Sequence, residues 1–310
     1  MTPPSAQRGW LAFRQFAAIT AAGTDAFRLF SGADGWVERL GADALISYQT
    51  PGARDELMAG LQAWTAVNDW MPQRIFGRLL PRHNADRDVP GLLSGDPSLP
   101  LTTVVREAGV NFGIDFGAGY SAGLFPDQRA NRAHLRRCAP RRLLNTFAYT
   151  CSFSTVAALA GAETLSVDLS RKSLDRGRGN FTLNGLDPER GHRFLADDVL
   201  EVLPRLARRG EKFDAIVLDP PTFSRGNKGR RWQVEQDFED LLAAALEVAT
   251  RDARILLSTN CAKLAPGILE RMGRHVLKLT RRTGEFQRQP QPPDFPPGHG
   301  ARTLWLSLRS

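Results

Sequence analysis

The sequence predicts an α/β protein: a mostly parallel sheet with helices on both faces, preceded by a smaller α+β domain. In the second half of the chain, five short aliphatic runs each precede a segment that can form a helix. This alternation is typical of a parallel sheet covered on both faces. Two further aliphatic runs close the chain and bring the expected number of strands to seven. The first 122 residues lack the alternation and carry glycine-rich turn signals instead.

The larger domain, residues 123–310, is expected to hold the seven strands. The strands are expected at the aliphatic runs 143–147, 163–168, 192–196, 213–219, 253–259, 275–280 and 303–308. Helices are expected at 153–161, 170–184, 199–208, 232–250 and 266–275. The segment QRQPQPPDFPPGHG contains five prolines, so we expect an extended loop there.

The smaller domain, residues 1–122, reads as antiparallel strands with one helix. FRLFSGADGWVERLGADALISYQT has apolar runs broken by glycine-rich turns, and ARDELMAGLQAWTAV has the composition of a helix. After a polar, proline-rich stretch at 81–100, TTVVREAGVNFGIDF and GYSAGLF predict a further hairpin.

Composition excludes several classes of protein. Hydrophobic residues make up 42% and charged residues 24% of the chain, which is ordinary for a soluble globular protein. No run approaches the roughly 20 apolar residues that span a bilayer, and the first residues do not resemble a secretory signal. We therefore expect a cytoplasmic protein without a membrane segment. Cys138, Cys151 and Cys261 are too few and too scattered for a disulfide framework or a zinc site, so no metal is expected.

Arginine accounts for much of the net charge of +8. Two clusters, RANRAHLRRCAPRR and RGNKGRR, hold Arg129, Arg132, Arg136, Arg137, Arg141, Arg142, Arg225, Lys228, Arg230 and Arg231. Guanidinium groups suit phosphate oxygens, so a nucleic-acid surface is one interpretation. A solvated basic face is the other.

The strand ends carry the candidate cofactor site, because ligands of open parallel sheets bind at the carboxyl ends of the strands. The first strand leads into NTFAYTCSFS, where a tight turn would let backbone N–H groups approach a ligand. The second ends in Asp168, whose carboxylate can accept both ribose hydroxyls of a nucleoside. The third ends at Asp197 and Asp198, where a side chain can receive an adenine amino group. No GxGxxG or GxxxxGK[ST] motif is present, which disfavours dehydrogenases and P-loop proteins.

The fourth strand ends in Asp219-Pro220-Pro221-Thr222-Phe223. Two successive prolines fix φ and remove two N–H donors, so the turn is stiff and its flanking groups are held in place. Taken together, the four strand ends indicate a nucleoside-containing cofactor.

These motifs resemble the bacterial large-subunit (23S) rRNA base methyltransferase family, which depends on S-adenosylmethionine. The resemblance is carried by NTFAYTCSFS, SVDLSRKSLDRGRGNFTLNGL, DDVLEVL, FDAIVLDPPTFSR and GYSAGLFPDQRANR, and FRLFSGADGWVERLGADALISYQ resembles the small central domain of the cytosine-C5 members. It covers about residues 25–310. It implies a Rossmann-like class I methyltransferase fold, S-adenosyl-L-methionine as cofactor and RNA, specifically rRNA, as partner.

The resemblance also implies roles for individual residues. Asp168 would hold the ribose, Asp198 the adenine edge, and Asp219 would close the pocket. Further cofactor contacts would come from Asn145, Phe147, Tyr149, Thr150, Ser152, Leu169, Ser170, Asp197, Gln128 and Arg129. The substrate would be contacted by Pro220, Pro221, Phe223, Asn260, Arg225, Arg230 and Arg231.

Two departures from the family pattern are visible. Cys151 stands where the family usually has glycine, and its side chain is expected to shift the turn or weaken cofactor binding. The chain before the central domain is also expected to be too short for the RNA-binding domain that many cytosine-C5 members carry. RNA would then be held by the arginine clusters or by the smaller domain.

The methylated atom depends on Cys261. Carbon 5 of a pyrimidine is a poor nucleophile and needs a thiolate that adds at carbon 6. RILLSTNCAKLA aligns without gaps to the ILLTFSCSGL-like segment of the cytosine-C5 members, so Cys261 is a candidate catalytic nucleophile with Asp219 orienting or deprotonating the base. Alternatively, LDPPTF followed by SRGNKGRR resembles the guanine-N7 members. Guanine N7 or an exocyclic amine has its own lone pair, and Cys261 would then be incidental.

Two other classes stay open. A methyltransferase for a small molecule or a protein would have its arginine clusters away from the pocket mouth. A non-catalytic RNA-binding relative is suggested by Cys151 in the cofactor turn.

Overall fold

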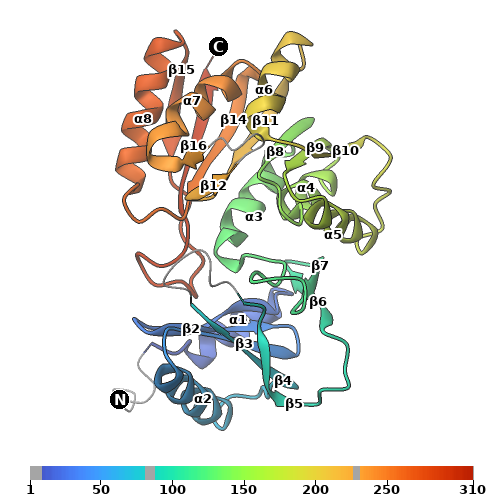
Figure 1. Ribbon diagram of the computed structural model, residues 1–310, viewed down its shortest axis with the longest axis vertical. Coiled ribbons are helices and arrows are strands. Elements are labelled where there is room, and N and C mark those ends of the chain that lie inside the picture. Colours follow the sequence, from blue (N-terminus) through green and yellow to red (C-terminus); the bar gives the residue numbers. More distant parts are fainter. Residues whose placement is uncertain (1–8, 81–87, 226–230, 310) are drawn as a thin grey trace. The chain divides into compact units, whose positions relative to one another are not determined.

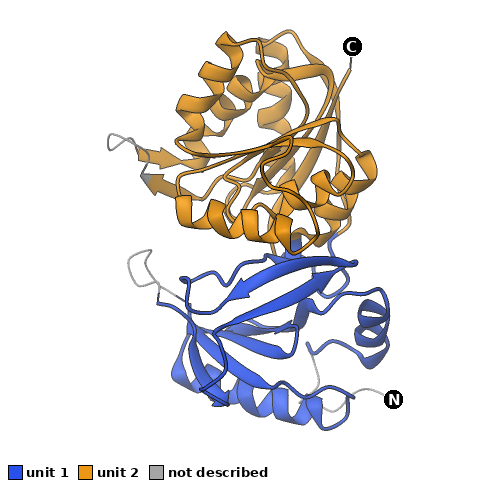
Figure 2. Cartoon of the chain, turned by 90° about the vertical axis from the view of Figure 1, so that its right-hand side faces the viewer, with its two compact units in different colours: residues 1–127, 291–299 blue, residues 128–290, 300–310 orange. Residues whose placement is uncertain are grey.

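The computed structural model describes residues 9–80, 88–225 and 231–309, which form two compact units (Figure 2). Unit 1 comprises Met1–Asp127 and Gln291–His299, and unit 2 comprises Gln128–Pro290 and Gly300–Ser310. The sequence put the boundary at 122/123 and the proline-rich loop in the second domain. Among the described residues, no helix is both long and apolar enough to cross a membrane.

Unit 2 is built on the expected seven-stranded sheet (Figure 1). In spatial order the strands are β10 (His192–Ala196), β9 (Glu163–Asp168), β8 (Arg142–Thr146), β11 (Phe213–Leu218), β14 (Ala249–Thr259), β16 (Arg302–Arg309) and β15 (Thr283–Gln287). The first five strands pair in parallel, and β16 is antiparallel to both of its neighbours. The order is that of a doubly wound sheet with one antiparallel strand inserted between the fifth and sixth strands. The predicted α/β, Rossmann-like fold is confirmed.

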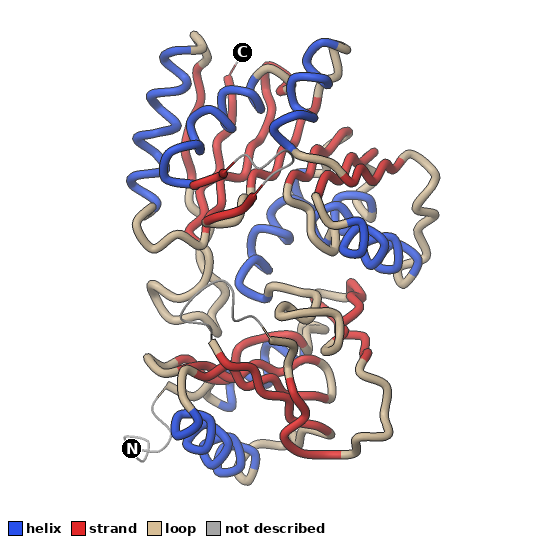
Figure 3. The backbone as a smooth tube through the Cα atoms, in the orientation of Figure 1, coloured by secondary structure: helices blue, strands red, loops and turns tan. Residues whose placement is uncertain are grey.

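Helices cover both faces of this sheet (Figure 3). They are α3 (Arg129–Cys138), α4 (Ser152–Ala158), α5 (Arg171–Thr182), α6 (Val199–Arg208), α7 (Val234–Leu246) and α8 (Pro266–Leu279). From β8 the chain moves outward to β9 and β10, then crosses back to β11 and continues to β14 and β15. Because parallel crossovers are right-handed, α4 and α5 lie on one face and α6, α7 and α8 on the other. The apolar core lies between the sheet and the second helix layer.

One expected strand of unit 2 is wrong. The run HVLKLT at 275–280 belongs almost entirely to α8, and the edge strand is β15 instead. The buried residues of α8 are Leu269, Gly273, Val276 and Leu277. This spacing is helical, so the run is the end of an amphipathic helix rather than a strand. A short hairpin that the sequence did not predict, β12 (Phe223–Arg225) with β13 (Arg231–Gln233), precedes α7.

Unit 1 has its own sheet and core. Its elements are α1 (Phe13–Ala21), β1 (Ala26–Ser31), β2 (Gly35–Leu40), β3 (Asp43–Tyr48), α2 (Pro51–Thr65), β4 (Arg74–Leu79), β5 (Gly91–Gly95), β6 (Thr102–Glu107) and β7 (Val110–Asp115). The first five strands form one sheet in chain order, antiparallel except for β3 with β4, and β6 pairs with β7 as a hairpin. Thr50 caps α2 by accepting the Ala53 N–H, with Pro51 in the first turn.

The sequence missed or misplaced four parts of unit 1. Helix α1 and strand β4 were not expected, and β5 lies in the stretch read as irregular. GYSAGLF forms no strand, since β6 and β7 both come from the preceding segment.

The proline-rich loop folds against unit 1 through Arg28. The Arg28 backbone N–H donates to Asp294 Oδ2 at 2.9 Å, and the guanidinium carbon lies 4.4 Å from the centre of the Phe295 ring. Both loop side chains are buried, so these contacts hold a segment without regular structure in place.

Candidate functional site

The predicted cofactor residues lie along the edge of the unit 2 sheet where the parallel strands end. Because the chain leaves β8 and β11 in opposite directions, a crevice is expected beyond their ends. The segments that follow β8, β9, β10, β11 and β14 all start at this edge and contain the predicted residues. The strand order therefore brings together sites that are spread over more than 100 residues of sequence.

The turn after β8 is strained. Phe147, Tyr149 and Cys151 have φ values of 53°, 47° and 58°, in the left-handed region that side chains other than glycine rarely adopt. Each costs of the order of 1–3 kcal/mol and persists only where surrounding contacts impose it. Here the Ala148 N–H donates to the Val167 carbonyl at 3.0 Å and the Cys151 N–H to the Ala148 carbonyl at 2.8 Å. Strain held in this way is typical of ligand sites.

Asp168 ties the strained turn to the next strand. Its Oδ2 accepts the Tyr149 N–H and its Oδ1 accepts the Ser170 N–H, each at 2.8 Å. Burial raises the pKa of the carboxyl, and these two hydrogen bonds oppose the rise. Each oxygen keeps a further lone pair, so the carboxylate can still accept two hydroxyls. This arrangement fits a ribose.

Cys151 does not narrow the pocket, although the sequence suggested that it could shift the turn. Its side chain is fully buried in an apolar cluster with Ala148, Leu174 and Phe181. The thiol lies against α5 at Gly177, where a Cβ would approach Sγ to 2.5 Å. The absence of a side chain on Gly177 therefore makes room for the one on Cys151. Burial raises the pKa of the thiol to about 12, so it stays protonated.

Several predicted residues support the turn from behind. Asn145 donates to Ser154 Oγ at 2.9 Å, and the Thr150 carbonyl accepts the Asn180 side chain at 2.8 Å. Asn145 and Thr150 are each 1% exposed. Ser152, at the start of α4, lies 3.5 Å from an Arg132 nitrogen. These residues shape the turn more than they line the pocket.

A small pocket opens beside Asp168. It is lined by Phe147, Leu169, Asp198, Val199, Leu200, Ser224 and Trp232. Asp198 caps α6 by accepting the Leu200 N–H at 3.0 Å, which leaves its second oxygen for a ligand. Apolar walls with one carboxylate are suited to an adenine ring and its amino group.

Asp197 is placed differently from its neighbour. Its carboxylate accepts a hydrogen bond from the Arg205 side chain, and this bond lowers the pKa of Asp197. It also accepts the Asp198 N–H at 2.8 Å. Asp197 therefore holds the loop after β10 in place and is not among the residues that line the pocket.

The sequence missed Ser224 and Trp232. Both come from the β12–β13 hairpin, which was read partly as loop and partly as the start of a helix. Trp232 is 3% exposed, donates its indole N–H to the Pro221 carbonyl at 2.9 Å, and packs 6.1 Å from the Phe147 ring. Trp232 follows Pro221 by 11 residues in the sequence, so only the fold brings it to the proline turn.

The turn after β11 holds the other side of the site. Gln128 Nε2 lies 3.4 Å from Asp219 Oδ2 and 2.9 Å from Ser258 Oγ, so the predicted pair Gln128 and Asp219 is brought together.

The predicted substrate residues differ in exposure. Pro220 is buried, whereas Pro221, Phe223, Asn260 and Arg231 are exposed. Arg129 starts α3 and is half-buried. The side chain of Arg225, with Lys228 and Arg230, lies outside the described residues.

Cys261 is 4% exposed and belongs to the apolar core between the sheet and its helices. Its backbone N–H donates to Thr259 Oγ1 at 3.1 Å. The pKa of the nearby Glu235 carboxyl is lowered mainly by a backbone hydrogen bond. Burial opposes this shift, and the Cys261 side chain adds a smaller lowering effect. A thiol buried in this way lacks the partial exposure that reactive cysteines have.

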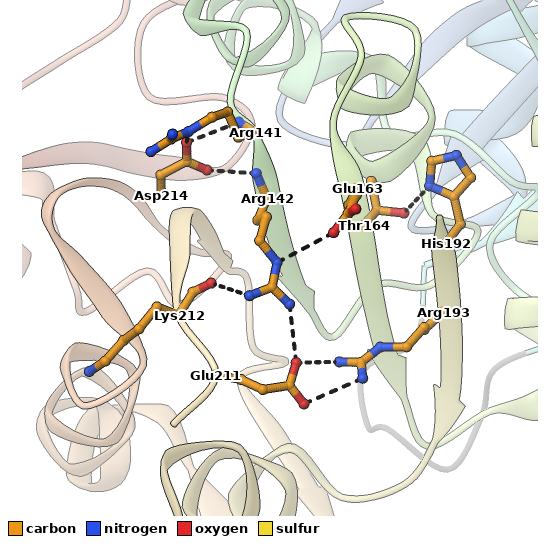
Figure 4. Close-up of polar contacts among 9 residues, drawn as sticks. All are labelled: Arg141, Arg142, Glu163, Thr164, His192, Arg193, Glu211, Lys212 and Asp214. Carbon is orange, nitrogen blue, oxygen red and sulfur yellow. Dashed lines mark hydrogen bonds and ion pairs between the residues drawn. The ribbon is translucent and has the colours of Figure 1, made fainter. Parts of the chain in front are cut away.

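The arginines of RANRAHLRRCAPRR separate into different environments. Arg132 is 1% exposed, and Arg136 and Arg137 are exposed at the end of α3. Arg141 and Arg142 lie at the opposite, amino-terminal edge of the sheet, where both face carboxylates (Figure 4).

Among the described residues, no group of three or more His, Cys, Asp or Glu side chains could hold a metal ion.

Comparison with known proteins supports the architecture. SMU.776, a protein described as a candidate methyltransferase and crystallised with SAH, superposes with a TM-score of 0.80 at 23% identity, over 99% of this chain and 83% of that chain. The SAM-dependent methyltransferase from Agrobacterium tumefaciens superposes with a TM-score of 0.70 at 23% identity, over 92% and 90% of the two chains. At this identity the likeness shows the fold.

Sequence similarity identifies the family. The chain is 33% identical over 269 residues to ribosomal RNA large subunit methyltransferase I of Erwinia tasmaniensis, covering 83% of this chain and 64% of that protein. The chain spans 40% to 64% of the length of the curated relatives it matches. A family profile described as S-adenosylmethionine-dependent methyltransferase matches residues 33–307. With the strand order and the site at the strand ends, this match shows that the chain belongs to the S-adenosylmethionine-dependent methyltransferase family.

Proposed function

We propose that this protein transfers the methyl group of S-adenosylmethionine to a base in ribosomal RNA. The observation that carries the proposal is Asp168: a half-buried carboxylate, oriented by two backbone N–H groups, beside an apolar pocket with a second carboxylate. A nucleoside cofactor needs both features.

The chain's own residues would bind the cofactor in three parts. Asp168 accepts the ribose hydroxyls, and Phe147 and Leu169 enclose the adenine while Asp198 accepts its amino group. The turn at 147–151 would place the sulfonium end toward Asp219. The bound cofactor supplies an activated methyl group, so the protein mainly has to align acceptor and donor.

RNA as the substrate is supported by the relatives and by the surface. The relatives from Erwinia tasmaniensis and Shigella flexneri are both named as ribosomal RNA large subunit methyltransferases. Phe223, Asn260 and Arg231 are exposed beside the turn after β11, as stacking, hydrogen-bonding and phosphate-binding groups should be. Unit 1 is the proposed recognition domain for the RNA around the target base.

The burial of Cys261 favours a nitrogen acceptor over cytosine C5. A ring nitrogen or an exocyclic amine attacks with its own lone pair, and Asp219 can accept an N–H from the edge of the base to orient it. The C5 route would require Cys261 to leave the apolar core and lose its proton. Cys261→Ser separates the two: methyl transfer at the wild-type rate is expected for a nitrogen acceptor, and a loss of turnover with cofactor binding intact would establish the thiol as nucleophile.

Mass spectrometry of rRNA nucleosides from a strain lacking the gene tests the substrate. One methylated nucleoside should be missing and should return when the gene is restored. If the nucleosides are unchanged while the purified protein binds the cofactor, the acceptor is a small molecule or a protein. If the protein binds RNA but shows no heat of binding with millimolar cofactor, it is a non-catalytic relative.

A further inference from the structure

A chain of buried amide side chains runs from β16 through α3 to Asp219. Trp305 donates its indole N–H to Asn131 Oδ1 at 2.9 Å, and Asn131 Nδ2 donates to Gln128 Oε1 at 2.8 Å. Gln128 Nε2 then faces Ser258 Oγ at 2.9 Å and Asp219 Oδ2 at 3.4 Å. We call Trp305, Asn131 and Gln128 the amide relay.

The relay is shielded from water. Trp305 is 2% exposed, and Asn131 and Gln128 are each 3% exposed. Water cannot replace a lost partner at such sites, so each group depends on the next one. Its members come from β16, from α3 and from the 3-10 turn just before α3. Their targets, Asp219 and Ser258, lie just after β11 and near the end of β14, so no short segment of chain could create the arrangement alone.

The first member fixes the direction of every hydrogen bond. An indole nitrogen can only donate, so Asn131 must turn its oxygen toward Trp305 and its nitrogen toward Gln128. Gln128 must then turn its oxygen toward Asn131 and its nitrogen toward Asp219. An amide side chain without such neighbours could take either orientation. If Gln128 were reversed, a carbonyl oxygen would face the carboxylate and repel it.

We propose that Asn131 and Trp305 are positioning residues for methyl transfer, acting through Gln128 to hold the Asp219 carboxylate against the acceptor base. This inference rests on the proposed function. The relay touches neither cofactor nor base. It sets the angle of the carboxylate, and misplacing a reacting group by about 1 Å can lower a rate about 100-fold.

Two substitutions, one at Trp305 and one at Asn131, test different members of the relay. Trp305→Phe keeps an aromatic ring and removes the N–H donor, so Asn131 and Gln128 lose their fixed orientation. Asn131→Asp places a carboxylate against Gln128 Oε1, which forces Gln128 to reverse. His134→Ala is the matched control, because the His134 ring packs 4.7 Å from the Trp305 ring without joining the relay.

The kinetic test is a double-mutant cycle in which kcat and KM are measured in the steady state, with single-turnover rates at saturating cofactor and RNA to isolate the chemical step. Trp305→Phe and Asn131→Asp should each lower kcat about 10- to 100-fold, with KM for RNA and cofactor Kd within threefold of wild type. His134→Ala should lower thermal stability and leave kcat unchanged. In an Asp219→Asn background, Trp305→Phe should have no further effect on kcat. Full additivity there, or a kcat loss in His134→Ala equal to that in Trp305→Phe, would overturn the relay.

A second measurement does not need turnover, so it separates failure of the relay from failure of the proposed function. In ¹⁵N-labelled protein, the side-chain NH₂ of Gln128, assigned as the signal missing from Gln128→Leu, should exchange slowly with solvent. Exchange should become at least tenfold faster in Trp305→Phe and stay slow in His134→Ala. Equal exchange in the two variants would rule out the relay even if the protein methylates RNA.

Discussion

Two carboxylates at opposite edges of the unit 2 sheet, Glu211 and Asp168, use their charge differently. At the amino edge, Glu211 accepts hydrogen bonds from Arg142 at 3.2 Å and from Arg193 at 2.7 Å, and Asp214 accepts the backbone N–H groups of Arg141 and Arg142 (Figure 4). There, side-chain charges are paired with one another. At the carboxyl edge, Asp168 accepts two backbone N–H groups and borders a turn with three strained residues.

The difference separates stability from function along the same strands. Charges that neutralise each other need no ligand, and exposed pairs contribute little beyond holding loops in register. A half-buried carboxylate with spare lone pairs, beside a strained turn, costs free energy that ligand binding can offset. The following substitutions test this contrast, from the largest expected effect to the smallest.

Asp168→Asn should weaken binding of S-adenosylmethionine about 100-fold or more. Two hydroxyls lose a charged acceptor, and each such hydrogen bond contributes about 1.5–3 kcal/mol. Isothermal titration measures the change, with circular dichroism to verify folding. Glu163→Gln, at the amino end of the same strand, is the control and should bind like wild type. An Asp168→Asn protein within threefold of wild-type affinity would remove Asp168 from the site.

On acidification, cofactor affinity should begin to fall at a higher pH than it would if Asp168 had the pKa of an ordinary aspartate. Burial raises the pKa of Asp168 in the folded protein, and the protonated acid cannot accept both hydroxyls. The affinity loss should approach tenfold per pH unit below that pKa. The linkage to stability has the opposite sign: the contribution of Asp168 is fully present below the unfolded pKa and is lost as pH rises through the folded one. Titrations from pH 7 to pH 4 should show the loss in wild type and a flat profile in Asp168→Asn.

Gly177→Ala should disturb the cofactor turn from a distance. The added Cβ would lie 2.5 Å from Cys151 Sγ and 2.9 Å from Cys151 Cβ, so the turn must shift. Overpacking of this kind costs about 1–3 kcal/mol and should weaken cofactor binding about tenfold. The double variant Gly177→Ala/Cys151→Gly should recover most of both losses. If the second substitution restores nothing, the two residues do not compensate each other.

Glu211→Gln should have the smallest effect, confined to stability. Arg142 and Arg193 lose a charged partner, but both are about half exposed, so about 1 kcal/mol or less is expected. Thermal unfolding should occur about 2–4 °C lower, with cofactor Kd unchanged. A tenfold change in Kd would show that the two edges are coupled.

The sequence predicted the sheet and most of its strand ends because each strand is a continuous apolar run followed by a polar residue. It misread 275–280, where a helical stripe and a strand look alike over six residues. It also missed Trp232, since a strand of three residues is too short to give a periodic signal.

Contacts between distant segments could not be predicted from the sequence, for a different reason. Gly177 offsets Cys151 only because α5 packs against the turn, and no local pattern encodes that pairing. Likewise, an arginine-rich helix cannot reveal that Arg132 is buried while Arg136 is exposed until its packing is known.

Methyl transfer from tritiated S-adenosylmethionine to purified rRNA tests the proposed function most directly. Large-subunit rRNA from a strain lacking the gene should accept label from the wild-type protein, and rRNA from the parent strain, already methylated, should not. Asp168→Asn should transfer none at the same cofactor concentration. Equal labelling of both rRNAs, or no labelling by a wild-type protein that binds the cofactor, would contradict an rRNA base as the substrate.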